Sequence, residues 1–285
     1  MQRKSSMTFK TAAATCLIFA ASPLVSAAQT SDGTKSATLS YADFADLADA
    51  APLVAVARIS SIIALPEKTV QNVPPGQKRV FVEAEVTSLI RGEGGISPRV
   101  RYLYDAPLNG RGKLPKLKKT QVILFARPGG RPGEIQLVAG DAQIPATTAA
   151  IEQVKAILSE LVASNAPPRI IGPGDAFHVA GTVAGEGETQ IFLRTATGDP
   201  VSLSILRRPG QQPKWAVALG EIVDEAARPP APGSLLWYRL ACSLPPTLPG
   251  SSVRALAPAD AEAARIDYAF VIQSLGNCGR TRSAR

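Results

Sequence analysis

The chain contains a single histidine, His178, and the carboxylates of Glu186 and Glu188 follow it within ten residues. All three lie in the stretch "FHVAGTVAGEGETQIFL". Two carboxylates that flank a cleft can act as acid and base in glycan hydrolysis, provided that one of them is desolvated. Glycine and glutamate are also typical of an exposed hairpin turn, because glycine adopts positive φ and charge keeps a sheet edge soluble. We favour the hairpin and keep the three residues as candidate catalytic groups.

The same stretch makes a prediction about the orientation of His178. Successive side chains of a strand point to opposite faces of the sheet. Phe177 and Val179 are apolar, so we expect them to face the core and His178 to face solvent. A catalytic role for the histidine would require an acidic partner that the fold brings close to it.

Most other catalytic motifs are missing from the sequence. A serine nucleophile on a sharp turn requires Gly-x-Ser-x-Gly, and the nearest match, around Ser97, lacks the second glycine. An ordinary zinc site needs several histidines or cysteines, and the chain has one histidine and three cysteines. We therefore predict no metal and no cofactor, and the sequence leaves open whether the protein is an enzyme.

Four lysines lie close together in the stretch "GKLPKLKKT", residues 112–120. Clustered positive charge attracts phospholipid headgroups, lipopolysaccharide or anionic glycans. A solvated hairpin loop is the alternative, because no aromatic residue is interleaved with the lysines. The candidate binding residues are Lys113, Lys116, Lys118 and Lys119.

The first 27 residues have the features of a signal peptide. Basic residues precede an apolar core at residues 11–25, and the small residues after it favour cleavage after Ala27 or Ala28. We expect a periplasmic or secreted protein with no transmembrane span after cleavage. Removal of these 27 residues lowers the formal net charge from +8 to +5. This mild charge and the expected export lead us to predict no nucleic-acid partner.

Export also determines the expected state of the cysteines. Cys16 leaves with the signal peptide, so Cys242 and Cys278 remain in the mature chain. Two cysteines in an oxidising compartment favour one disulfide, and a pair of free thiols is the alternative.

Hydrophobic periodicity predicts a mainly β protein with few helices, in the α+β class. A capping-box pattern at Ser40 and Asp43 predicts a short helix that ends before Pro52. A β-barrel-like domain over residues 28–146 should follow, and its strand at residues 120–127 should be central because it is apolar on both faces. The predicted strands are residues 53–65, 78–92, 99–105, 120–127 and 133–140.

An apolar stripe at helical spacing predicts an amphipathic helix at residues 147–166, which would connect two β-rich barrel or sandwich halves. The second half, residues 167–285, should be an antiparallel β-domain that contains the disulfide. Its six strand candidates are "FHVAGTV", "ETQIFLRT", "PVSLSILRR", "KWAVALG", "SLLWYRLAC" and "RIDYAFVIQSLG".

The segments "DAAPLVAVARI", "RVFVEAEVTSLIRGE" and "LKKTQVILFARP" together resemble the OB-type barrel of netrin-like and TIMP-like modules. The resemblance implies a small five-stranded barrel over about 100 residues of the first half. Inhibitory members of that class use an N-terminal cysteine to reach a protease metal, and the expected mature N-terminus has none, so inhibition does not carry over. The whole chain resembles exported proteins of alphaproteobacterial type.

These patterns favour an exported, non-catalytic binding or scaffolding protein of the bacterial envelope. Its partner would be an anionic envelope component or another periplasmic protein. The alternative is a periplasmic hydrolase that acts on glycans through carboxylates near Glu186 and Glu188.

Overall fold

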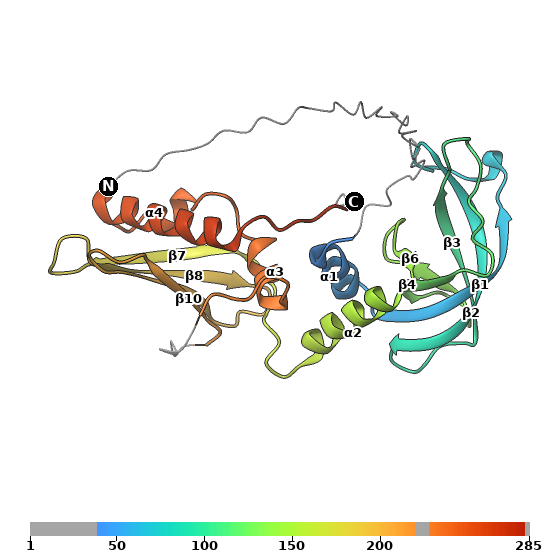
Figure 1. The fold of residues 1–285 in the computed structure, drawn as a ribbon, viewed down its shortest axis with the longest axis horizontal. Coiled ribbons are helices and arrows are strands. Elements are labelled where there is room, and N and C mark those ends of the chain that lie inside the picture. Colours follow the sequence, from blue (N-terminus) through green and yellow to red (C-terminus); the bar gives the residue numbers. More distant parts are fainter. Residues whose placement is uncertain (1–38, 221–227, 283–285) are drawn as a thin grey trace, which may run out of the picture. The chain divides into compact units, whose positions relative to one another are not determined.

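The computed structural model describes residues 39–220 and 228–282 (Figure 1). The predicted signal peptide, Cys16 and the segment up to residue 38 lie outside the described residues. Within the two described ranges, two antiparallel sheets and four α-helices form a mainly β structure, which confirms the predicted fold class. No helix in these ranges is long and apolar enough to cross a membrane.

A short helix precedes the first sheet, and a second helix follows it. In chain order the elements are α1 (Tyr41–Ala50), β1 (Leu53–Ala64), η1 (Glu67–Thr69), β2 (Gln77–Arg91), β3 (Arg99–Pro107), β4 (Gln121–Pro128), β5 (Ile135–Leu137), β6 (Gln143–Pro145) and α2 (Thr148–Val162). The five predicted strands and both predicted helices of this half are therefore present.

The first sheet has the order β3-β2-β1-β4-β5, and β6 pairs with β4. A single parallel bridge between Arg101 of β3 and Glu134, just before β5, brings the two ends of this order together. The five strands thus form a ring that is closed at one point. Alternate residues of β2 face its interior, since Val80, Val82 and Ala84 are buried.

Two hydrophobic cores share strands β1 and β4. One core fills the ring, and the other starts beneath α1 and α2 and continues through the second sheet and its helices. In β4, Leu124 belongs to the first core and Ile123 and Phe125 belong to the second. Because both of its faces are buried, β4 is apolar throughout and central, as its sequence predicts.

Helix α1 begins with the predicted capping box. The Ser40 hydroxyl accepts a hydrogen bond from the Asp43 N–H at 3.2 Å, and the Ser40 N–H donates to the Asp43 carboxylate at 2.9 Å. These two bonds satisfy backbone groups that have no partner inside the helix.

The second part of the chain forms a meander of four strands, in the order β10-β9-β8-β7, together with two α-helices. In chain order its elements are β7 (Ile170–Ala180), β8 (Gly187–Thr195), β9 (Val201–Arg207), β10 (Lys214–Ala218), α3 (Leu235–Ala241), η2 (Gly250–Val253) and α4 (Pro258–Leu275). Helix α4 covers one face of this sheet (Figure 1).

Two of the six strands predicted in this half are wrong, because "SLLWYRLAC" and "RIDYAFVIQSLG" form α3 and α4. The Ser234 hydroxyl caps α3, and Pro258 occupies the first turn of α4, where its missing N–H costs nothing. Helical spacing explains the burial along α4, where Ile266 is 52% exposed although it is apolar. The buried residues of α4 are Ala261, Ala264, Asp267, Tyr268, Val271 and Leu275.

The β7–β8 hairpin exists, but its side chains point the other way from the prediction. Phe177 and Val179 are 55% and 68% exposed, and His178 is half-buried on the face beneath α4. The prediction assumed that the apolar side chains face the core, whereas the face beneath α4 carries the polar side chains of His178 and Thr189. Phe177 instead packs edge-on against Phe192 on the open face, with 5.8 Å between ring centroids.

Candidate binding site

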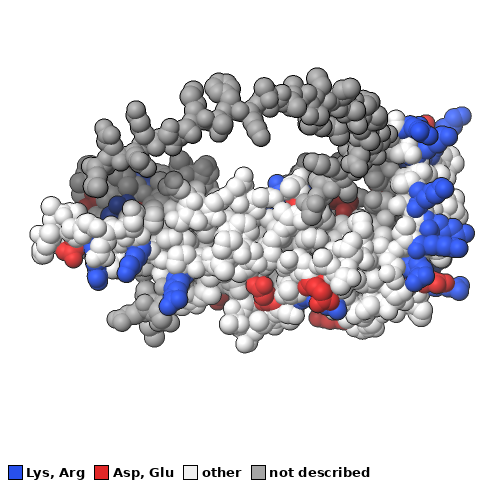
Figure 2. All heavy atoms as spheres, in the orientation of Figure 1, with Lys and Arg blue, Asp and Glu red and all other residues white. Residues whose placement is uncertain are grey.

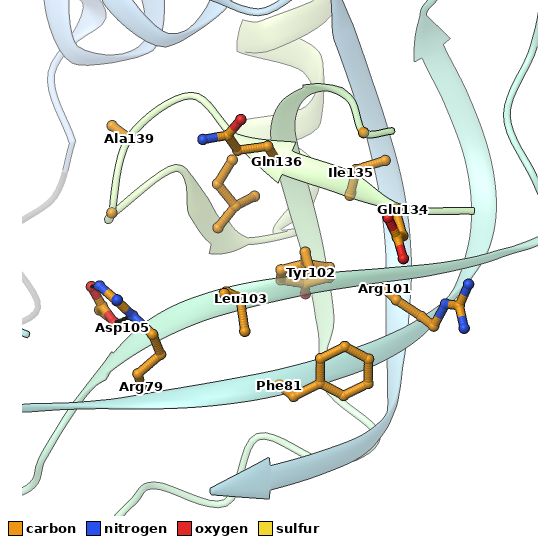
Figure 3. Close-up of a pocket in the computed structure, with 13 residues that line it drawn as sticks. Arg79, Phe81, Arg101, Tyr102, Leu103, Asp105, Glu134, Ile135, Gln136 and Ala139 are labelled. Carbon is orange, nitrogen blue, oxygen red and sulfur yellow. Dashed lines mark hydrogen bonds and ion pairs between the residues drawn. The ribbon is translucent and has the colours of Figure 1, made fainter. Parts of the chain in front are cut away.

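A concave surface lies along β3 and the β4–β5 connection. A pocket of about 680 Å³ opens beside β3, between its edge and β5 (Figure 3). On the β2–β3 face, Phe81 is half-buried and Leu103 is 51% exposed. An exposed apolar side chain beside a concave surface is typical of a binding site.

Charged groups stand at both ends of this pocket, as Figure 3 shows. At one end the Arg79 guanidinium makes a bidentate pair with the Asp105 carboxylate, at 2.7 and 2.8 Å. At the other end Arg101 lies near Glu134. The floor is apolar, with a buried tyrosine, Tyr102, beneath the strand.

The hydroxyl of Tyr102 stays protonated in this setting. Burial, followed by the neighbouring Tyr104, raises its pKa. The hydroxyl donates to the Gln143 side-chain oxygen at 2.6 Å, so β3 is tied to β6 across the interior of the ring. This bond fixes the floor of the pocket.

Two further pockets adjoin the first one: a pocket of about 610 Å³ that shares Glu134 with it and a pocket of about 510 Å³ that shares Arg101 with it. The smaller one is polar and includes Glu83 and Glu85, which are exposed on the outer face of β2. The concave surface therefore extends along β3 from an apolar end to a polar end.

The predicted lysine cluster lies on an ordered loop between β3 and β4. Leu114 and Leu117 are half-buried and pack against the core of the ring, while the four lysines are exposed. The loop is further held by the Lys119 N–H, which donates to the Ile59 carbonyl at 2.7 Å. In the described part of the chain, no ion pair involves Lys113, Lys116, Lys118 or Lys119.

Positive charge is concentrated in this half of the protein. Residues 53–146 contain fourteen Lys and Arg and seven Asp and Glu, a net charge of +7. This exceeds the +5 expected of the whole mature chain. Figure 2 shows Lys and Arg side chains gathered along the side of the molecule that the first sheet occupies.

The structure connects His178 to a buried carboxylate through Thr189, a link that sequence could not show. The His178 Nδ1 lies 2.8 Å from the Thr189 hydroxyl, and that hydroxyl donates to the Asp267 carboxylate of α4. Asp267 is fully buried and also accepts a hydrogen bond from Arg207. Three strands and one helix thus converge on a single buried carboxylate.

The two predicted carboxylates, Glu186 and Glu188, do not join this cluster. Both are exposed, Glu186 at the end of the β7–β8 connection and Glu188 in β8. Gly187 between them lies against the His178 ring, since a Cβ there would meet the Cε1 atom at 3.0 Å. The glycine of "GEGE" therefore makes room for the imidazole, and neither glutamate is desolvated as acid–base catalysis on a glycan requires.

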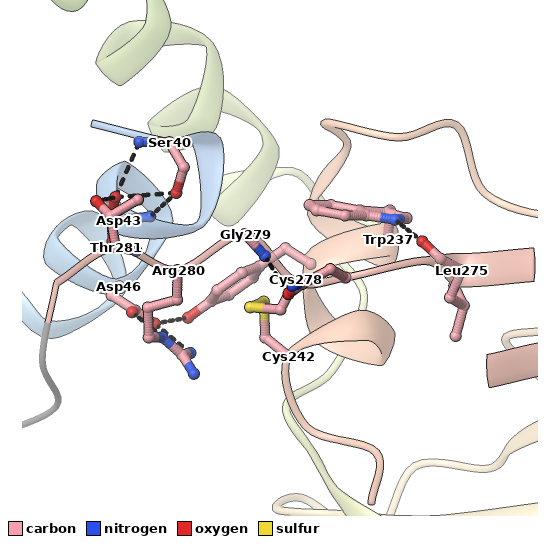
Figure 4. The surroundings of a disulfide bond; sticks show 12 residues. Ser40, Asp43, Asp46, Trp237, Cys242, Leu275, Cys278, Gly279, Arg280 and Thr281 are labelled. Atoms are coloured by element: carbon pink, nitrogen blue, oxygen red, sulfur yellow. Dashed lines mark hydrogen bonds and ion pairs between the residues drawn. A yellow bond between two sulfur atoms is a disulfide. The ribbon is translucent and has the colours of Figure 1, made fainter. Parts of the chain in front are cut away.

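The predicted disulfide joins Cys242, at the end of α3, to Cys278 in the tail after α4. Beyond it the tail reaches α1 (Figure 4). The Arg280 guanidinium contacts the Asp46 carboxylate at 2.5 and 2.8 Å, and Thr281 and Arg282 bind Asp43. The disulfide thus lies at the base of a tail that is fixed at both ends.

No three or more His, Cys, Asp or Glu side chains in residues 39–220 and 228–282 gather to hold a metal ion. Sequence reasoning missed the pocket beside β3. The sequence did contain an indication of it, because two apolar residues occupy outward-facing positions of their strands. Phe81 alternates with the inward-facing valines of β2, and Leu103 alternates with two buried tyrosines of β3. No known family model matches the chain, and no curated protein sequence matches it.

Proposed function

We propose that the chain is an exported, non-catalytic binding protein of the bacterial envelope, periplasmic or secreted, whose first half attaches to an anionic surface. One observation carries this proposal: four lysines project from a loop that two leucines hold against the ring. Lysines fixed in this way lose less conformational freedom on binding than lysines of a free segment. The net positive charge of residues 53–146 would also attract the same anionic surface over a longer range and so speed association.

The order of the strands supports the resemblance to OB-type barrels. The ring runs β1-β2-β3-β5-β4 and returns to β1, with β3 and the start of β5 joined in parallel. The fold alone assigns no ligand, so the lysine loop and not the fold carries the functional argument.

Binding of the mature protein to lipid vesicles tests the attachment. Anionic vesicles containing phosphatidylglycerol should bind the protein, zwitterionic vesicles should not, and added salt should weaken the binding. Each lysine near an anionic membrane contributes about 1 kcal/mol, so K116A/K118A/K119A should weaken binding roughly 100-fold. The charge-matched control R208A/K214A/R254A changes three exposed cations of the second half and should leave the affinity within about twofold. Equal losses in the two variants would reject a specific role for the loop.

Export is tested separately. N-terminal sequencing of the protein from the periplasm or the medium should find a chain that begins at Ala28 or Gln29. Recovery of a full-length chain that begins at Met1 would contradict the proposed cleavage.

A further inference from the structure

The edge of β3 that points away from β2 presents free backbone groups. The Arg101 N–H donates to the Gly133 carbonyl at 2.8 Å, so its backbone points to that edge. The Val86 N–H donates to the Pro98 carbonyl at 2.9 Å, so the backbone of Pro98 points toward β2. Hydrogen-bonded and non-hydrogen-bonded pairs alternate along an antiparallel ladder, so Arg101, three positions later, again points away from β2. Leu103 and Asp105 therefore also present their N–H and C=O groups to the outer edge.

No strand in the described part of the chain pairs with these groups. After the bridge at Arg101, β3 makes no further pair with β5, and β5 pairs only with β4. Among the described residues, no backbone hydrogen bond reaches the Leu103 or Asp105 N–H from this side. Pro107 is the next residue whose backbone points to the outer edge. It has no N–H, so the row of donors ends before it.

The opposite wall of the pocket is also a strand edge. The Gly129 N–H donates to the Glu134 carbonyl, and the Val138 N–H donates to the Phe125 carbonyl. These two bonds join β4 to alternate residues of the β5 segment, and Ile135 and Leu137 are the residues between the bonded positions. Ile135 and Leu137 consequently direct their backbone groups away from β4, toward β3. The pocket of about 680 Å³ lies between two edges whose facing backbone groups make no backbone hydrogen bond with another described residue beyond the bridge at Arg101.

We propose that this gap binds an extended peptide segment of a partner protein, which adds a strand to the edge of β3. Backbone pairing would supply the affinity, and the side chains that flank the gap would supply the selectivity. Phe81 and Leu103 offer an apolar contact to every second peptide side chain on the outer face. The net charge of +7 over residues 53–146 favours a peptide with acidic flanks.

An extended peptide fits these groups better than a glycan does. A sugar has no regular row of amides, so it would leave alternate N–H and C=O groups of β3 unpaired. The site is also separate from the lysine loop, and the two proposals can therefore fail independently.

Amide hydrogen exchange of the mature protein, followed by NMR, tests the pairing. The probe is a synthetic heptapeptide of alternating valine and threonine with a glutamate at each end. Its binding should slow exchange at the Leu103 and Asp105 amides, whereas the Tyr102 and Tyr104 amides, already bonded to β2, should change little. Unchanged exchange at Leu103 and Asp105 with 1 mM peptide would overturn the proposal.

Two matched changes separate backbone pairing from adhesion to an apolar surface. The same peptide N-methylated on one edge should bind at least about tenfold more weakly, because it loses its donors toward β3. Leu103→Pro removes one edge donor without breaking the β2 ladder, and it should weaken binding about tenfold relative to Leu103→Ala. If the proline variant does not fold, the N-methylated peptide still decides. Equal affinity for the two peptides would overturn the proposal.

The exchange data without peptide identify other occupants. Leu103 and Asp105 amides that are already protected in a dilute sample would show that the chain covers its own edge. Protection that rises with protein concentration would show that two copies pair there. Either result would overturn the proposal in favour of that occupant.

Discussion

Thr281 binds Asp43 through both its backbone N–H, at 2.9 Å, and its hydroxyl, at 2.6 Å, across 238 positions of sequence. Asp43 is also the capping-box residue of α1, so one buried carboxylate serves both ends of the described chain. Burial opposes its ionisation, but hydrogen bonds from the Thr281 hydroxyl and from three backbone N–H groups outweigh burial. Together they lower the pKa of Asp43 to about 2.

This lowered pKa predicts a loss of stability in acid. A carboxyl whose pKa is lower in the folded state than in the unfolded state stabilises the fold above pH 4. That contribution, about 2 kcal/mol, should disappear as the pH falls from 4 to 2. Urea unfolding of wild type and Asp43→Asn at several pH values measures it. The variant should be less stable at pH 6 and lose less between pH 4 and 2, whereas exposed Asp175→Asn should follow wild type.

Reduction of the disulfide should also destabilise the protein. Cys242 and Cys278 lie 36 positions apart, which corresponds to about 4 kcal/mol in the chain-entropy model. Urea unfolding with and without reductant gives the difference, and C242S/C278S should match the reduced protein and be insensitive to reductant. Two alkylatable thiols in the unreduced mature protein would contradict the bridge.

Gly187 should tolerate alanine poorly because of His178. A Cβ at this position would lie 3.0 Å from the imidazole, and overpacking of this kind costs roughly 1–3 kcal/mol. Gly130→Ala is the control, since nothing lies within 4 Å of its Cβ position. Addition of His178→Ala to Gly187→Ala should recover part of the loss in a double-mutant cycle. Additive losses would mean that the glycine serves another purpose.

Asp267 should be one of the most sensitive positions of the second half. Its removal leaves Arg207 and Thr189 without their shared acceptor, and breaking a buried pair costs roughly 3 kcal/mol. Thermal unfolding of Asp267→Ala measures the loss, and Glu262→Ala, exposed on the same helix, should change stability by less than about 0.5 kcal/mol. Thr189→Val should fall between them, because the carboxylate keeps its arginine.

The strands of the first half were predictable because each face of a strand lies in a single environment, either the core or solvent, along its length. In β2, inward valines alternate with outward glutamates, and β4 is apolar because both of its faces are buried. The pocket beside β3 was not predictable in the same way. It depends on which strands are neighbours and on where β3 and β5 separate, and neither is written in local periodicity.

Helix α4 shows why the second half was harder to predict. Its buried face contains two alanines and an aspartate, so the helical repeat carries little hydrophobic signal, and alternation around Tyr268 suggests a strand. Better signals were Pro258 and Asp260, which suit the first turn of a helix. The burial of His178 escaped prediction for a different reason, because the apolar face of this hairpin is the exposed one and the face beneath α4 carries a polar cluster.

The contacts of α1 also determine when the protein can finish folding. Its carboxylates at Asp43, Asp46 and Asp49 bind groups that come after residue 168 in the sequence, and several come after residue 238. A chain that emerges from a ribosome, N-terminus first, must hold this helix without these partners until Arg280 and Thr281 have been released. The contacts of α1 are therefore complete only after residues 280–282 have emerged, and a chain that stalls before them leaves an acidic helix face uncovered.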